Sequence, residues 1–168
     1  NEGADALVAL FEIGAYTISM QILRNNEIIY DRDQNFGGAQ LTQLIARQYG
    51  FSLEEAENKK RNGDLPPDYG SAVLKPFVQS MTQEVSRALQ FFFTSTPYNH
   101  IDHILLAGGS ASLPGLVDSI TQQTGFSCGL INPFEGMEIS GSVRLKKMAR
   151  EAPLYLTACG LAMRRFVA

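Results

Sequence analysis

The sequence predicts an α/β domain, and three observations support this fold class. Three short strand patterns follow one another before residue 36, helical patterns then occupy residues 41–94, and strands and helices alternate beyond residue 101. Strands interspersed with helices are typical of a sheet that is covered by helices. With 168 residues, the chain is long enough for one well-formed hydrophobic core and too short for two comfortable ones.

The N-terminal part of the chain predicts a meander of three strands. Residues 6–13 are apolar at nearly every position, which is the pattern of a strand buried on both faces. Residues 17–23 alternate between apolar and polar side chains, and residues 28–32 form a third, shorter strand pattern. The polar residues 24–27 predict the turn that joins the second strand to the third.

Helical patterns follow the meander. Apolar residues at helical spacing predict a helix over residues 41–49, with Gly50 as its stop signal. Ser52 and Glu55 form the pattern of a capping box at the start of a second helix, residues 53–61. The longest apolar stripe predicts one continuous helix over residues 71–94, with Pro76 near its first turn, where a missing N–H costs little.

The rest of the chain predicts a strand over 101–107, a helix over 114–123, a strand over 126–131 and a last helix over 153–166. Residues 141–151 carry no clear structural pattern but include a basic patch from Arg144 to Arg150. We expect this patch to be a solvated face, and contact with an anionic lipid or with a partner is the other possibility.

The composition argues against several classes of function. A net charge of −3 without a basic block disfavours a nucleic-acid partner, and no apolar stretch approaches the length that spans a bilayer. Cys128 and Cys159 are better suited to a reduced, cytosolic compartment than to a disulfide framework. His100 and His103 lack further ligands at useful spacing, so we expect no metal site there. The chain begins at Asn1 without the features of a signal peptide, and we expect it to be part of a longer protein.

Three glycine-containing junctions are candidates for a binding site. In the first, Gly14 would let the backbone approach a ligand, while Glu12 offers a carboxylate and Thr17 a hydroxyl, which together could hold a phosphate and orient Mg²⁺. Taken alone, this segment fits a plain β-hairpin turn better. The pair Gly37-Gly38 before a helix suits a helix N-terminus that faces an anion or another chain segment, although, taken alone, a simple strand-to-helix connector explains it better.

The third junction lies where a buried strand runs into Gly108-Gly109-Ser110 and then into a helix. Ligands of open α/β sheets bind outside the carboxyl ends of strands, so this is an expected position for one. The junction has neither the Walker pattern nor the Rossmann glycine pattern.

The order and spacing of the three junctions resemble the second half of the superfamily of actin, heat-shock chaperones and sugar kinases. Within it, five stretches look like the PilM family of type IV pilus assembly proteins: FGGAQLTQLIA from Phe36, EEAENKK from Glu54, LLAGGSASLPGL from Leu105, NPF from Asn132 and APLYLTACGLAMR from Ala152. The resemblance covers residues 7–166. The cell-division protein FtsA shares the superfamily motifs, but matches this chain less closely.

The resemblance implies one lobe of a two-lobed actin-like (ribonuclease H-like) fold, with a mixed sheet flanked by helices. Residues 7–36 and 101–151 would form the core subdomain, 38–96 the helical part of the second subdomain, and 153–166 a helix directed toward the other lobe. It also implies ATP and Mg²⁺ as cofactors of the full-length protein, with weak or no binding by this half alone. The implied contacts are one phosphate turn, a glycine pair before a helix, an adenosine-contacting helix and an adenosine turn, made by Glu12, Gly14, Ala15, Thr17, Gly37, Gly38, Glu57, Lys60, Gly108, Gly109 and Ser110.

This chain departs from the superfamily pattern at Glu12, where the phosphate turn usually carries an aspartate. The additional methylene moves the carboxylate by about 1 Å, and a displacement of that size can cost ~10²-fold in rate. Nucleotide binding through the backbone is compatible with the change, whereas hydrolysis is left open. Before the resemblance is considered, Glu57 and Lys60 are equally well explained as a solvated ion pair.

The resemblance implies an ATP-binding scaffold rather than an efficient enzyme. PilM-family proteins bind the short cytoplasmic tail of the membrane protein PilN, join the inner-membrane complex of the type IV pilus, and communicate with its motor ATPases in twitching motility. The expected location is therefore cytoplasmic and peripheral to the inner membrane through partners, without direct insertion. Most of the PilN site is expected in the other lobe.

Two alternatives remain open at this point. One is an active kinase or ATPase of the same fold, and the other is an FtsA-like filament protein that is tied to the membrane by a C-terminal amphipathic helix. We also expect that the last helix, with Leu154, Ala158, Leu161 and Ala162 on one face, is displaced or causes weak self-association when the other lobe is absent.

Overall fold

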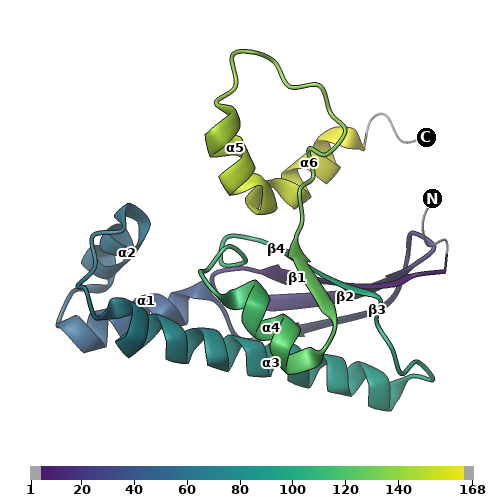
Figure 1. Ribbon diagram of the computed structural model, residues 1–168, viewed down its shortest axis with the longest axis horizontal. Coiled ribbons are helices and arrows are strands. Elements are labelled where there is room, and N and C mark those ends of the chain that lie inside the picture. The colour runs from purple at the N-terminus through teal and green to yellow at the C-terminus, as the bar shows by residue number, and fades with distance from the viewer. Residues whose placement is uncertain (1–4, 165–168) are drawn as a thin grey trace.

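The computed structural model describes residues 5–164 of the chain (Figure 1). A five-stranded sheet forms its centre, with the strand order β3-β2-β1-β4-β5. The first three strands pair antiparallel, whereas β4 is parallel to both β1 and β5. The sheet is therefore mixed, as expected. The strands are β1 (Leu7–Ile13), β2 (Ile18–Arg24), β3 (Glu27–Gln34), β4 (His103–Ala107) and β5 (Ser127–Leu130).

Strand β1 is not buried on both faces, so this expectation was wrong. Phe11 and Ile13 are fully buried on the face that carries the core, Leu10 on the opposite face is half-buried, and Glu12 is exposed. An apolar run in the sequence therefore corresponds to one packed face and one partly open face, because the long helix α3 and helix α4 cover only one side of the sheet (Figure 1).

The turn between β2 and β3 confirms the predicted meander. Asn25 and Asn26 have φ angles of 53° and 65°, the left-handed conformation that a two-residue hairpin turn requires. Asparagine tolerates this conformation better than most residues, so the Asn-Asn pair fixes the register of the hairpin.

The first four helices agree largely in extent with the sequence patterns. They are α1 (Gly38–Tyr49), α2 (Leu53–Asn62), α3 (Lys75–Ser95) and α4 (Leu116–Thr124). Ser52 caps α2 as predicted, since its hydroxyl accepts the N–H of Glu55 at 3.1 Å. Helix α4 begins two residues after Pro114, with Gly115 in the left-handed conformation before it.

The predicted continuous helix over 71–94 is interrupted at its start. A π-helical turn (Gly70–Leu74) precedes α3, and the N–H of Lys75 bonds to the carbonyl oxygen of Gly70. Pro76 follows immediately. Its ring would collide with the carbonyl of the residue four positions earlier in a regular α-helix, so the widened turn accommodates it.

The core lies between the sheet and α3. Phe11, Phe77 and Phe92 are its largest fully buried side chains, and the ring of Tyr30 meets that of Phe92 edge-on at 5.3 Å. Phe91, on the same helix, is 45% exposed. The guanidinium of Arg32 lies 4.0 Å above the centre of its ring, which explains how this phenylalanine is tolerated at the surface.

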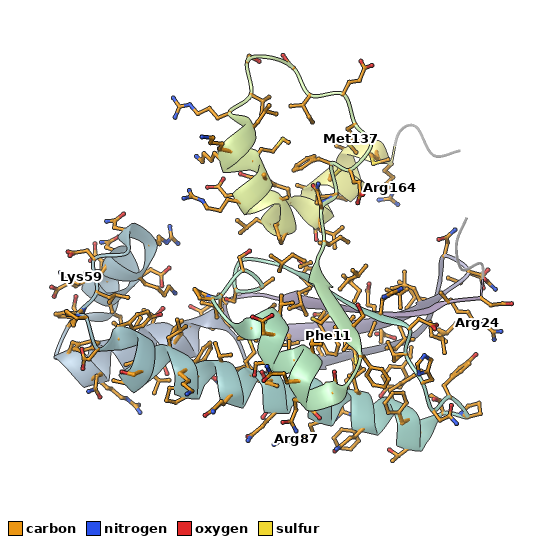
Figure 2. The ribbon with its side chains drawn as sticks, in the orientation of Figure 1. Phe11, Arg24, Lys59, Arg87, Met137 and Arg164 are labelled. Carbon is orange, nitrogen blue, oxygen red and sulfur yellow. The ribbon has the colours of Figure 1, made fainter. Side chains whose placement is uncertain are left out.

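The C-terminal segment projects from the end of the sheet as a separate pair of helices (Figures 1 and 2). Residues 141–151, which lacked a sequence pattern, include helix α5 (Leu145–Glu151). The last helix was expected to begin at residue 153, but residues Ala152–Tyr155 form a 3-10 turn and α6 comprises Leu156–Met163. Pro153 lies in the first turn of this segment, where its missing N–H costs little. The expected end at Phe166 lies outside the described residues.

Helix α6 has no buried residue. Leu154 is 52% exposed and Leu161 64% exposed, so the expected apolar face exists and faces away from the core of the described part of the chain. Over residues 5–164, no helix combines the length and the apolar character needed to cross a bilayer.

Candidate functional site

The three glycine turns, which are far apart in the sequence, meet at one edge of the sheet. The N–H of Gly38 donates to the carbonyl oxygen of Gly14 at 3.0 Å, and the N–H of Ala39 donates to that of Ala15 at 2.8 Å. The N–H of Ser110 donates to the carbonyl of Ile13 at 3.1 Å. The end of β1 therefore holds both the start of α1 and the turn after β4 through backbone hydrogen bonds.

These close approaches explain why glycine occupies the turns. A Cβ atom at Gly37 would lie 2.5 Å from the carbonyl oxygen of Ala15, and one at Gly108 would lie 2.5 Å from that of Ile13. Gly108 also has a φ of +90°, a conformation that other residues rarely adopt. A Cβ atom at Gly38 would collide with the hydroxyl of Ser110. The glycines thus allow three backbone segments to come into contact.

A cleft of about 1030 Å³ lies beside this junction, between the glycine turns and α2. Its size is suited to a small-molecule ligand. Residues from the turns, from α1 and α2 and from the C-terminal segment line it: Gly14, Ala15, Tyr16, Gly38, Ala39, Leu41, Thr42, Gln43, Leu53, Glu54, Glu57, Lys60, Arg61, Gly109, Ser110, Leu113, Glu151 and Leu154.

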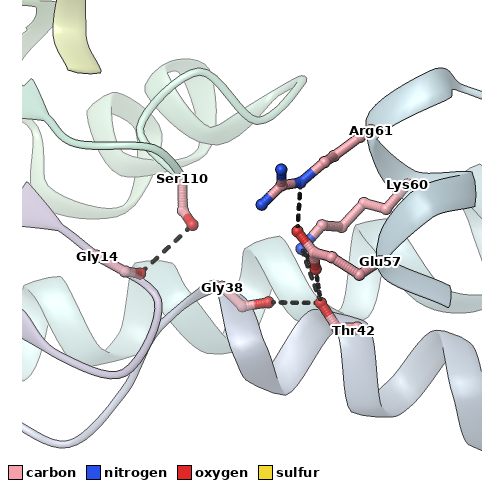
Figure 3. Close-up of polar contacts among 7 residues, drawn as sticks. All are labelled: Gly14, Gly38, Thr42, Glu57, Lys60, Arg61 and Ser110. Atoms are coloured by element: carbon pink, nitrogen blue, oxygen red, sulfur yellow. Dashed lines mark hydrogen bonds and ion pairs between the residues drawn. The ribbon is translucent and has the colours of Figure 1, made fainter. Parts of the chain in front are cut away.

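A charged network closes the α2 end of the cleft (Figure 3). The buried hydroxyl of Thr42 donates to Glu57 Oε2 at 2.6 Å and accepts a hydrogen bond from Lys60 Nζ at 2.7 Å. Lys60 Nζ also lies 2.7 Å from Glu57 Oε2, and Arg61 Nε donates to Glu57 Oε1 at 2.9 Å. Glu57 therefore has partners on both carboxylate oxygens and is fixed at the wall of the cleft.

The network keeps Glu57 ionised. Partial burial acts to raise its pKa, but the hydrogen bonds from Lys60, Thr42 and Arg61 outweigh this effect and lower the pKa from 4.5 to about 2. The ion pair between Glu57 and Lys60 is attached to α1 through Thr42, and both residues line the cleft. This position agrees with a role of the two residues in a binding site.

The structure brings most of the predicted site residues together. Those that line the cleft are Gly14, Ala15, Gly38, Glu57, Lys60, Gly109 and Ser110. Gly37 and Gly108 lie behind its wall, where they permit the turns to touch. Thr17 has an exposed side chain outside the lining, and its carbonyl accepts the N–H of Gly14 at 2.9 Å.

Glu12 also lies outside the lining of the cleft. Its side chain is exposed, and its Oε1 accepts a hydrogen bond from the hydroxyl of Thr157 in α6 at 3.1 Å. The acid of the first turn therefore faces the C-terminal helix.

The sequence patterns missed several residues of the site. Thr42 could have been found, because it lies four positions after Gly38 and therefore on the same face of α1. Arg61 follows Glu57 by four positions in the same way. Glu151 and Leu154 carried no local signal, since only the path of the C-terminal segment brings them to the cleft.

The two histidines serve the fold. His100 Nε2 lies 3.3 Å from Asp102 Oδ1, and the other oxygen of Asp102 accepts the N–H of Leu7 at 2.7 Å. This backbone hydrogen bond lowers the pKa of Asp102. Within the described residues, no three His, Cys, Asp or Glu side chains gather as a metal site would require.

The family model described as "Type IV pilus assembly protein PilM" matches residues 1–166. The chain belongs to the PilM family. The structure described as "PilM-PilN type IV pilus biogenesis complex" superposes on it with a TM-score of 0.82 and 27% sequence identity, covering 97% of this chain and 47% of the other. The resemblance stated from the five sequence stretches is thereby confirmed.

Other solved structures establish the fold of this PilM-family chain as one actin-like lobe. Ethanolamine utilization protein EutJ from Carboxydothermus hydrogenoformans has a TM-score of 0.66 at 20% identity, covering 95% of this chain and 49% of EutJ. MreB 5 of Spiroplasma citri, in a structure bound to AMPPNP, has a TM-score of 0.65 at 13% identity, covering 97% of this chain and 54% of MreB 5.

The chain spans only part of the length of its relatives. The curated protein EutJ of Escherichia coli K12 is 28% identical over 115 residues, which is 67% of this chain and 37% of EutJ.

Proposed function

We propose that this PilM-family chain binds ATP in the cleft between the glycine turns and α2, and that bound nucleotide controls a protein partner of the type IV pilus. The observation that carries the proposal is the convergence of the Gly14, Gly38 and Gly109 turns at one cleft. A nucleotide offers phosphates that need backbone donors and a sugar and base that need a separate wall, and this cleft has both kinds of surface.

Backbone N–H groups without an acceptor support binding of the phosphates at the glycine turns. Among residues 5–164, the N–H groups of Ala15, Tyr16 and Gly109 have no protein acceptor, and all three residues line the cleft. Backbone N–H groups in tight turns are common phosphate ligands. The absence of a Cβ at Gly109 leaves its backbone accessible from the cleft.

The polar side chains at the α2 end of the cleft support binding of the nucleoside part of ATP. Glu57 is an ionised acceptor, and Lys60 and Arg61 supply donors beside it. The resemblance implies that Glu57 and Lys60 contact adenosine. Bound ATP would supply an anionic link between the turns and α2, with Mg²⁺ neutralising part of its charge. The residues of the chain bind and orient it, and turnover of ATP is not part of the proposal.

Calorimetric titration of ATP with Mg²⁺ into the complete protein tests nucleotide binding. A tryptophan at Gly109 would extend into the cleft, because a Cβ there already lies 3.3 Å from Leu154 Cδ2. We expect Gly109→Trp to abolish binding. Gly141→Trp is the matched control, because a Cβ at Gly141 meets nothing within 4 Å.

A second variant separates a blocked cleft from a disturbed fold. Lys60→Met removes a cation from the cleft wall without altering a glycine turn, and we expect weaker binding with an unchanged circular dichroism spectrum. If the wild-type protein is folded and shows no heat of binding, the nucleotide proposal is wrong.

The partner we propose is the cytoplasmic tail of a PilN-like membrane protein. The similarity to the subunit of a PilM-PilN complex, over 97% of this chain, supports this partner. The test compares the affinity of a labelled PilN tail peptide for the complete protein with and without ATP. We expect ATP to change this affinity, and equal affinities in both states would contradict nucleotide control.

A further inference from the structure

A second concave surface lies in the projecting C-terminal segment. One wall is a single face of α5 and the following 3-10 turn, because Arg144, Lys147, Glu151 and Tyr155 recur at intervals of three and four. The opposite wall is the preceding loop, through Phe134 and Val143. We name this surface the basic groove; Met148 completes its lining, and its volume is about 460 Å³.

The apolar side chains of the two walls form the floor of the groove, where they are open to solvent. Val143 and Tyr155 are each 40% exposed, and α5 has no buried residue. The rings of Phe134 and Tyr155 contact each other with their centres 6.0 Å apart, and the N–H of Phe134 is held by the side chain of Asn132 at 3.1 Å. These contacts shape the groove before any ligand arrives.

The rim is positively charged. Within residues 5–164, neither Arg144 nor Lys147 forms an ion pair. The acidic residue of the groove is already engaged, since Glu151 accepts a hydrogen bond from the hydroxyl of Tyr155 at 3.2 Å and lies 3.7 Å from Arg150. In a chain with a net charge of −3, this local excess of positive charge favours an anionic partner.

We propose that the basic groove binds a short acidic segment of a partner protein. An apolar side chain of that segment packs against Phe134, Tyr155 and Val143, and neighbouring carboxylates pair with Arg144 and Lys147. Arginine binds carboxylates through two parallel hydrogen bonds, which gives such a contact direction as well as charge.

The concave shape favours a peptide over a membrane surface. A groove of about 460 Å³ accepts inserted side chains, whereas a lipid surface is contacted by a continuous, outward apolar face. Helix α5 is only seven residues long, which is short for an interfacial helix. The proposal does not depend on nucleotide binding.

Fluorescence anisotropy of the complete protein with a labelled peptide that alternates glutamate with leucine and phenylalanine tests this inference. We expect the double variant Arg144→Glu with Lys147→Glu to weaken binding by about tenfold or more. The matched control, Lys146→Glu with Lys75→Glu, makes the same change of net charge outside the groove lining and is expected to remain within about twofold of wild type.

Two further probes, a peptide without apolar residues and a lipid vesicle, distinguish groove binding from unspecific charge attraction and from membrane binding. A peptide with serine in place of the leucines and phenylalanines is expected to bind much less tightly, because the floor then has no apolar occupant. Equal losses for the groove and control variants, or equal binding of the serine peptide, would overturn the proposal in favour of unspecific charge attraction. Binding to phosphatidylglycerol vesicles that depends on Arg144 and Lys147, with no binding of the peptide, would identify a lipid surface instead.

Discussion

The hydroxyl of Thr157 in α6 donates a hydrogen bond of 3.1 Å to Glu12 at the end of β1, and the two residues are 145 positions apart in the sequence. The same segment makes two further contacts with the site. The carbonyl of Pro153 accepts the N–H of Gly108 at 2.8 Å, and Leu154 lies against Gly109. The C-terminal helices are therefore attached to the sheet at the glycine turns themselves, rather than through a hydrophobic interface.

Removing the Thr157 hydroxyl is expected to loosen α6. Thr157→Val keeps the shape of the side chain but leaves Glu12 without its donor, and one such bond is worth roughly 1 kcal/mol. We expect hydrogen exchange in residues 156–163 to accelerate roughly fivefold while β1 is unaffected. Thr157→Ser should restore protection, and exchange that is the same in all three proteins would show that the bond does not hold α6.

The ionisation of Glu57 is expected to make stability depend on acid pH. Its pKa is about 2 in the folded protein and 4.5 without the network, so its interactions stabilise the fold fully above about pH 4.5 and are lost as the pH falls toward 2. Because Glu57 is partly exposed, we expect Glu57→Gln to lower the free energy of unfolding at neutral pH by only about 1 kcal/mol.

Urea unfolding at a series of pH values measures this difference. The gap between wild type and Glu57→Gln is expected to narrow below about pH 4.5. Glu54→Gln is the control, since Glu54 lines the same cleft without an ion pair among the described residues. A gap that stays constant down to acid pH would contradict the ionised network.

Gly108 is expected to be far less replaceable than Gly125. Both have positive φ angles, +90° and +76°, but a Cβ at Gly108 meets the backbone of Ile13 whereas one at Gly125 meets nothing within 4 Å. We expect Gly125→Ala to cost ~1 kcal/mol and Gly108→Ala ~3 kcal/mol or more, measured by chemical denaturation. Equal losses would mean that the turn after β4 can move away from β1 at no cost.

The exposed face of α6 is expected to cause self-association. Leu161, which is 64% exposed, lies on an apolar helix without a covering element in the described part of the chain. In sedimentation velocity of this 168-residue chain, we expect concentration-dependent association that Leu161→Glu reduces. Ile28→Glu, at a position 55% exposed on β3, is the control and should have no effect. A wild-type chain that stays monomeric at high concentration would contradict the expectation.

The features that the sequence predicted well are those with local chemical causes. Ser52 caps α2, Asn25 and Asn26 form the hairpin turn, and Gly50 ends α1, because each conformation is favoured by the residue itself. The three glycine turns were also found, although their contact with one another rested on the resemblance and not on any local pattern.

The features that the sequence did not predict depend on contacts between distant segments. Nothing near Glu12 indicates that it faces Thr157, and nothing near Leu154 indicates that it lines the cleft. The π-helical turn before α3 and the 3-10 turn at Pro153 were missed for another reason. A proline marks a disturbance in the sequence, but the way the helix accommodates it depends on the packing around it.

The pairing of β1 with β4 has a consequence for the order of folding. Val8 lies opposite His103, so the two strands can join only after 95 residues have closed into a loop, whereas β1, β2 and β3 pair through short hairpins. Long loops are slow to close, and contacts of high sequence separation tend to form late. Since the turn after β4 supplies Gly109 and Ser110, the cleft is expected to mature last, and a nascent chain would complete its hairpins and α3 before it could hold any ligand.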